Sequence, residues 1–453
     1  MKRGVSRTVD MTEGSIWRHM VSFAVPVLLG NLFQQLYNTF DSIVVGRFAG
    51  KDALAAVASS GNLIFMMISF FVGLSMGAGV IISRWFGGKD TERLEAAIHT
   101  NVAFGCVCGI LLTVAGMTFT PQILVWMRTP ENVLPLSIQY FRIFFAGSLA
   151  SVLYNTFTGI MRAVGDSRTP LLFLIVASVT NIALDLLFVG ALDMGVAGAA
   201  TATVISQCLS AVLCARRLMR MEEPCRLHLR SIRFDRKQLR LIVSQGIPAG
   251  VQNSIIAIAN VVVQSNINTF GDSVMAGHGA YSKVEGFTFL PITAFSMALT
   301  TFIGQNLGAG KHERARQGAR FGVVSAMLLA EAIGGLIFLL APYAIALFND
   351  DPEVIAVGVQ AARTEAFFFF ALAMAHAISA VMRGIGRAQV PMYTMLGCWC
   401  LLRVAYITVA LQYYRSVLVI FTAYPLTWLA SCVVFAVFYF RIDWQKVARP
   451  ELL

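Results

Sequence analysis

Long apolar runs constrain the fold of this chain more than any other feature. Twelve runs of 18 or more predominantly apolar residues recur along its 453 residues, and each could cross the roughly 30 Å hydrocarbon core of a bilayer as a helix. The expected spans are residues 15–43, 53–82, 95–120, 134–160, 169–190, 195–215, 241–269, 275–303, 318–348, 355–381, 391–411 and 416–440. Only 13% of the residues are charged, against about 25% in soluble domains. The sequence therefore predicts an all-α integral membrane protein with twelve transmembrane helices.

The net charge of +11 is unevenly distributed. Most of the 35 lysine and arginine residues fall at the two termini and in every second connection, which share one side of the membrane if the helices alternate. The few in the other connections are Arg47, Lys51, Arg128 and Arg415. By the positive-inside rule, we expect an inner (plasma) membrane protein with both termini in the cytoplasm. The basic connection 216–240 is then expected to follow the anionic inner leaflet rather than to bind nucleic acid.

An internal repeat relates the two halves of the chain. MRAVGDSRTP at 161–170 matches MRGIGRAQVP at 382–391, an offset of 221 positions. The same offset pairs Gly50 with Gly271. Because one constant offset relates separated parts of the chain, it indicates an internal duplication. We therefore expect a six-helix N-terminal lobe, a basic linker and a six-helix C-terminal lobe, at residues 1–215, 216–240 and 241–453. Because six is even, the pseudo-symmetric lobes enter the membrane in the same direction, a plan that favours alternating-access transporters.

Acidic residues inside the expected spans are candidates for function. An ionised aspartate at mid-bilayer costs roughly 2.5–3.5 kcal/mol, so Asp41 in the first span needs a cavity, a partner or an ion. Tyr37 lies one turn earlier on the same face, and Pro26 interrupts the backbone hydrogen bonds and offers a hinge. Asn181 and Asp185 also share a helical face. Two neighbouring carboxyl groups can share a proton or bind Na⁺ through oxygen, and the sequence leaves these two ions open.

Three segments resemble the multidrug and toxic compound extrusion (MATE) family. They are the pattern P-x10-Y-x3-D that ends at Asp41, the run GVAGAATATVISQ at 195–207 and the run FIGQNLGAGKHERA at 302–315. The resemblance covers almost the whole chain, including the helix count and the duplication. It implies a secondary antiporter that exports organic, often cationic, drugs or toxic compounds in exchange for Na⁺ or H⁺.

The resemblance also implies a coupling site in the N-terminal lobe. The matching positions of this sequence are Asp41, Asn181, Asp185 and Thr203. A second cation site, formed in NorM-like members by acids of helices 7 and 10, lacks its acids here, which favours a DinF-like or MepA-like branch. Na⁺ at the coupling site is the only metal ion expected.

Polar residues of other spans could line a substrate cavity. The candidates are Gln34, Tyr37 and Gln252. Glu285, Glu331, Glu365 and Arg403 also fall inside expected spans. Structural pairing of Glu365 with either Arg363 or Arg403 is the favoured interpretation, and Glu331 has no assigned role.

Two other functions stay open. A flippase for lipid-linked precursors would share the fold, but its cavity should be basic, whereas the matched positions are acidic. A membrane-embedded enzyme is the remote alternative, because the sequence offers no metal-ligand spacing, nucleophile motif or nucleotide loop. We therefore expect no enzymatic activity, no cofactor beyond the coupling ion and no nucleic-acid partner. The expected partners are small organic substrates and membrane lipids, with the chain acting as a monomer.

Overall fold

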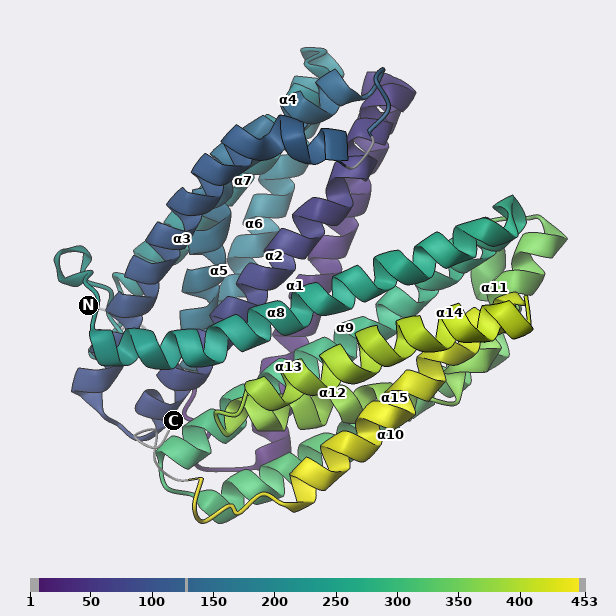
Figure 1. Cartoon of the computed structure of the whole chain (residues 1–453). Coiled ribbons are helices and arrows are strands. Elements are labelled where there is room, and N and C mark those ends of the chain that lie inside the picture. Colours follow the sequence, from purple (N-terminus) through teal and green to yellow (C-terminus); the bar gives the residue numbers. More distant parts are fainter. Residues whose placement is uncertain (1–7, 127–128, 448–453) are drawn as a thin grey trace. The chain divides into compact units, whose positions relative to one another are not determined.

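The structure, a computed structural model, describes residues 8–126 and 129–447, so Arg128 lies outside the described residues. The regular secondary structure of this part of the chain is entirely helical (Figure 1). Among the described residues, ten helices are long and apolar enough to cross a membrane, and two bent pairs of helices pass the same test together. Counting each bent pair as one span gives twelve in the described chain, which confirms the predicted fold class.

The described chain divides into two compact units. The first unit contains the described residues up to Asp10 and Val25–Val243. Its helices are the later part of α1 (Ile16–Val44), α2 (Gly50–Gly87), α3 (Thr91–Trp126), α4 (Leu134–Ala146), α5 (Ser148–Ala163), α6 (Arg168–Asp185), α7 (Gly195–Leu218) and the start of α8 (Arg236–Ile267). Two π-helical segments, Val45–Ala49 and Leu186–Ala191, follow α1 and α6 directly.

The second unit contains Met11–Ala24 and the described residues from Ser244 onward. Its helices are the start of α1, the later part of α8, α9 (Asp272–Gly308), α10 (His312–Ala346), α11 (Pro352–Ala366), α12 (Phe369–Gly384), α13 (Gln389–Met395), α14 (Arg403–Tyr413) and α15 (Val417–Phe440). The π-helical segment Leu396–Leu402 joins α13 to α14. Helices α9, α10 and α12 pack against one another within this unit (Figure 1).

The unit boundaries differ from the expected lobes and linker in two places. The connection after α7 is part of the first unit, because Met221, Cys225 and Leu227 are buried in one apolar cluster with Trp85. Residues 11–24 are part of the second unit although they precede the first repeat. Helix α1 therefore begins in one unit and ends in the other.

The fourth and tenth spans are bent helix pairs rather than the single helices that their apolar runs suggested. Helices α4 and α5 meet at 47°, and α11 and α12 meet at 56°. At the first bend, a Cβ added to Gly147 would lie 2.5 Å from the Val204 side chain, so this approach to α7 requires glycine. At the second bend, the Phe370 amide donates to Glu331 Oε2 at 3.1 Å. Glu331 thus satisfies an amide at the start of α12 that has no partner within its helix.

Candidate coupling site

Two carboxyl groups from different helices of the first unit lie within reach of each other. Asp41 comes from α1 and Asp185 from the last position of α6, and the two side chains lie close enough to interact electrostatically. Asp41 is 8% exposed and Asp185 is fully buried. The structure therefore brings together two acids that are 144 positions apart in the sequence.

The local helix geometry positions both acids beside irregular backbone. Asp185 immediately precedes the π-helical segment Leu186–Ala191, and Asp41 lies one turn before Val45–Ala49. Single π-helical turns break the regular register of a helix and are frequent at functional sites. Asn181 shares the buried face of α6 with Asp185, as the four-residue spacing predicted.

Several polar atoms of this group lack a hydrogen-bond partner. Among the described residues, this holds for Asp41 Oδ1, both carboxyl oxygens of Asp185, and the amide oxygen and nitrogen of Asn181. No ion pair to either carboxyl group is found in the same described part of the chain. Buried polar atoms are normally satisfied, so this oxygen-rich group fits a proton or a small hard cation such as Na⁺.

Two tyrosines complete the group. Tyr37 of α1 interacts through its hydroxyl with the side chain of Thr203 on α7, which places Thr203 beside the acids. Tyr140 of α4 is 6% exposed and interacts electrostatically with both Asp41 and Asp185. Tyr140 was not among the predicted residues, although a tyrosine within the apolar run SIQYFRIFF is a polar signal of the same kind as Tyr37.

The remaining predicted residues lie elsewhere. Gln34 is exposed on α1, and Pro26 is buried within α1, close to the position where that helix passes from the second unit to the first. Gln252 belongs to the second unit and is 2% exposed. Its amide group hydrogen-bonds to Ser379 at 3.2 Å and to Arg383 at 3.3 Å. Gln252 is therefore part of a separate buried polar cluster.

Comparison with known proteins identifies the family. A model of the MatE family matches residues 26–187 and again residues 248–409. The chain belongs to the MatE family. Because one model matches each half once, the comparison agrees with the internal repeat. MatE proteins and the relatives below are transporters, so this MatE chain is a multi-pass membrane transporter and not an enzyme.

Relatives of this MatE chain carry transporter names. It is 30% identical to the probable multidrug resistance protein YoeA of Bacillus subtilis strain 168, over 98% of both chains. It is 25% identical to the probable multidrug resistance protein NorM of Thermotoga maritima, over 85% of this chain and 83% of the relative. It is also 25% identical to an FAD transporter of Shewanella oneidensis, over 76% of this chain and 77% of the relative.

Solved structures of MATE transporters share the fold. A MATE crystallised in complex with MaL6 matches with a TM-score of 0.90 over 98% of this chain and 99% of that one, at 22% identity. An outward-facing multidrug resistance MATE transporter of the MOP superfamily gives the same values. At this identity, the likeness establishes the architecture of the MatE chain and leaves its substrate open.

Proposed function

We propose that this MatE protein is a secondary antiporter of the inner membrane that exports organic, mainly cationic, compounds in exchange for inward H⁺ or Na⁺. The observation that carries the proposal is the buried pair Asp41 and Asp185, which has no ion-pair partner among the described residues. A charge hidden from water must be neutralised. A proton or Na⁺ taken up from outside would neutralise it, and its release inside would restore the charge.

Coupling to such an ion supplies energy for export. One elementary charge that moves inward across 100 mV releases about 2.3 kcal/mol, enough to concentrate an uncharged substrate about fortyfold. A monovalent cation that moves outward uses the same electrical energy, so its one-for-one export is driven by the concentration gradient of the coupling ion. Asn181 would contribute amide atoms to the ion site, and the Tyr37 and Thr203 pair would hold the first-unit helices around it. The names of the multidrug resistance relatives support organic compounds as the substrate class.

The acid pair also supports export of cations over the flippase alternative. A site for an anionic lipid-linked precursor requires basic residues, whereas the side chains gathered here are acidic, amide or hydroxyl groups. We further propose that the protein works as a monomer, with both termini in the cytoplasm, among membrane lipids and without a cofactor beyond the coupling ion. The excess of basic residues in alternate connections supports this orientation.

Reconstituted liposomes test the proposal. Efflux of a fluorescent organic cation is measured under an imposed Na⁺ gradient and, separately, under an imposed pH gradient. The parent chain is expected to respond to one of them, and Asp41→Asn or Asp185→Asn is expected to lose at least about 90% of that response. Asp193→Asn is the matched control, because Asp193 is exposed and its φ of 52° suits asparagine. Equal gradient-driven efflux by the parent and Asp41→Asn would reject the assigned coupling role.

A further inference from the structure

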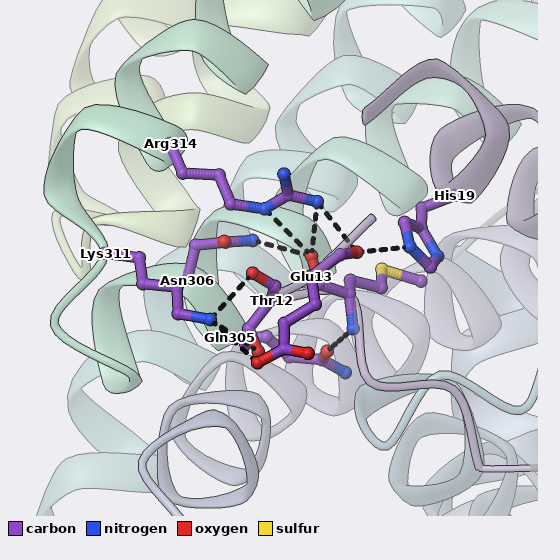
Figure 2. Close-up of polar contacts among 8 residues, drawn as sticks. Thr12, Glu13, His19, Gln305, Asn306, Lys311 and Arg314 are labelled. Carbon is purple, nitrogen blue, oxygen red and sulfur yellow. Dashed lines mark hydrogen bonds and ion pairs between the residues drawn. The ribbon is translucent and has the colours of Figure 1, made fainter. Parts of the chain in front are cut away.

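The segment before α1 is held by the turn between α9 and α10 of the second unit (Figure 2). The Met11 amide donates to Gln305 Oε1 at 2.9 Å, and Asn306 Nδ2 donates to the Met11 carbonyl at 3.3 Å. Gln305 and Asn306 lie in the last turn of α9 and are fully buried. Both amide side chains therefore bind backbone of a segment that is almost 300 positions distant in sequence.

Two basic residues at the start of α10 hold the same segment. Arg314 Nη2 donates to the carbonyls of Met11 at 3.2 Å and Glu13 at 3.0 Å. Lys311 Nζ donates to the Thr12 carbonyl at 3.0 Å, and Figure 2 shows both basic side chains directed at this short stretch. Met11 is 1% and Thr12 is 4% exposed. Four side chains therefore hydrogen-bond to the backbone of residues 11–13. Two of them are charged donors, which form the stronger hydrogen bonds.

The equivalent turn of the first unit does the same for the linker. Trp85 corresponds to Asn306 at the repeat offset, and its Nε1 donates to Gln238 Oε1 at 3.0 Å. One helix further along the first unit, Thr100 Oγ1 accepts from the Asp235 amide at 3.0 Å. In the first unit, the last turn of α2 therefore contacts the first turn of α8, and α3 contacts the residue just before α8. The second unit holds the segment before α1 from the corresponding α9–α10 turn.

We propose that residues 11–13 are a permanently docked element that fixes the start of α1 to the second unit throughout transport. Residues 16–24 of α1 would then move with the second unit, while the part from Val25 onward, which carries Asp41, moves with the first unit. Helix α1 becomes the mechanical link between the ion site and the second unit. Gln305, Asn306, Lys311 and Arg314 act as positioning residues for this link. The transport part of the test rests on the proposed function, and the docking part does not.

Thiol labelling tests the docking. Thr12→Cys places a probe at a buried position, and peptide mass spectrometry follows its reaction with a maleimide in the intact protein. Adding Lys311→Met and Arg314→Met should accelerate labelling at least about tenfold, because docking removes Thr12 from solvent. Arg316→Met is the matched control, since Arg316 is 63% exposed on the same helix and pairs with Glu313. Fast labelling in the Thr12→Cys parent, or equal acceleration by Arg316→Met, would overturn the docking.

A covalent tether tests whether the docking is permanent. In Thr12→Cys with Lys311→Cys, a short bifunctional thiol reagent joins the two positions, because Lys311 Nζ lies 3.5 Å from Thr12 Oγ1 in the parent chain. The tethered protein should transport at least as fast as the untethered double-cysteine variant, in which Lys311 no longer holds the segment. The Lys311→Met and Arg314→Met double variant should lose most of its maximal rate with an unchanged half-saturating substrate concentration. A block of transport by the tether, or an unchanged maximal rate in the double variant, would overturn the proposal.

If the proposed function is wrong, the result differs from the outcomes that would overturn the docking. In that case, the parent chain shows no gradient-driven efflux at all, while the labelling experiment still reports whether residues 11–13 are docked.

Discussion

Each unit buries carboxyl groups among tyrosines, but the two groups differ in how their charge is balanced. In the first unit, Asp41 and Asp185 have each other and no ion pair among the described residues. In the second unit, Glu365 is fully buried and accepts a hydrogen bond from the Tyr281 hydroxyl at 2.8 Å. Arg403, which is 2% exposed, interacts electrostatically with this carboxyl group, although no ion pair joins the two in the described chain. The second unit thus carries its own positive charge.

The environment of Arg403 explains why it can stay there. Its Nη2 donates to Thr427 Oγ1 at 2.9 Å, and its guanidinium lies 4.3 Å from the centre of the Tyr424 ring. Tyr424 occupies the repeat position of Thr203, and Tyr406 occupies that of Asp185. The duplicated halves have therefore diverged at matched positions. We interpret the difference as a division of labour, in which the first unit takes its cation from solution and the second unit keeps Arg403 as a resident one.

Removal of the resident charge should have the largest effect on stability. Arg403→Met removes the basic neighbour of Glu365 and Glu285 together with the hydrogen bond to Thr427 and the contact with the Tyr424 ring. A lost hydrogen bond to a charged group alone costs about 1.5–3 kcal/mol. Thermal unfolding in detergent should show this loss, and adding Glu365→Gln should recover part of it. An Arg403→Met protein as stable as its parent would remove the contrast between the units.

Loss of the Tyr281 hydroxyl should have the next largest effect. Tyr281→Phe removes the hydrogen bond to Glu365, and a bond to a charged group contributes about 1.5–3 kcal/mol. The unfolding temperature should fall, while Tyr393→Phe, an exposed tyrosine of α13, should leave it unchanged. Equal shifts in the two variants would show that the assay does not sense this contact.

Neutralisation of a buried acid should change the free energy of unfolding in opposite directions in the two units. Asp185→Asn removes a buried carboxyl group without an ion pair, so we expect a stabilisation of about 1–2 kcal/mol together with loss of coupled transport. Glu365→Gln should destabilise the protein, because it leaves buried Arg403 with less compensating charge. The same thermal assay compares both variants, and shifts of the same sign would contradict the division of labour.

Binding of the coupling ion should give the smallest change in stability. An ion that binds only the folded state at about ten times its dissociation constant adds about 1.4 kcal/mol. When the ion that drives efflux is added, the rise in unfolding temperature should disappear in Asp41→Asn and persist in Arg403→Met. A rise that persists in Asp41→Asn would place the ion elsewhere.

The sequence by itself determined the membrane class, the duplicated plan and much of the acid site. Apolar runs of sufficient length specify spanning helices, because unpaired backbone groups are too costly in lipid. The four-residue spacing of Asn181 and Asp185 placed them on one face of α6, and the structure agrees. The family resemblance added Thr203, which spacing alone could not connect to Asp41.

The tertiary structure decided which groups meet across helices. An apolar run does not reveal that Gly147 allows a bend against α7, or that Glu331 binds an amide at the bend before α12. Nor does it reveal that the backbone of residues 11–13 is bound by side chains of the α9–α10 turn. Helical periodicity fixes neighbours within a helix, whereas contacts between helices depend on packing of the whole chain. For that reason, the hydrogen bond from Tyr281 to Glu365 and the docking of the N-terminal segment emerged only from the fold.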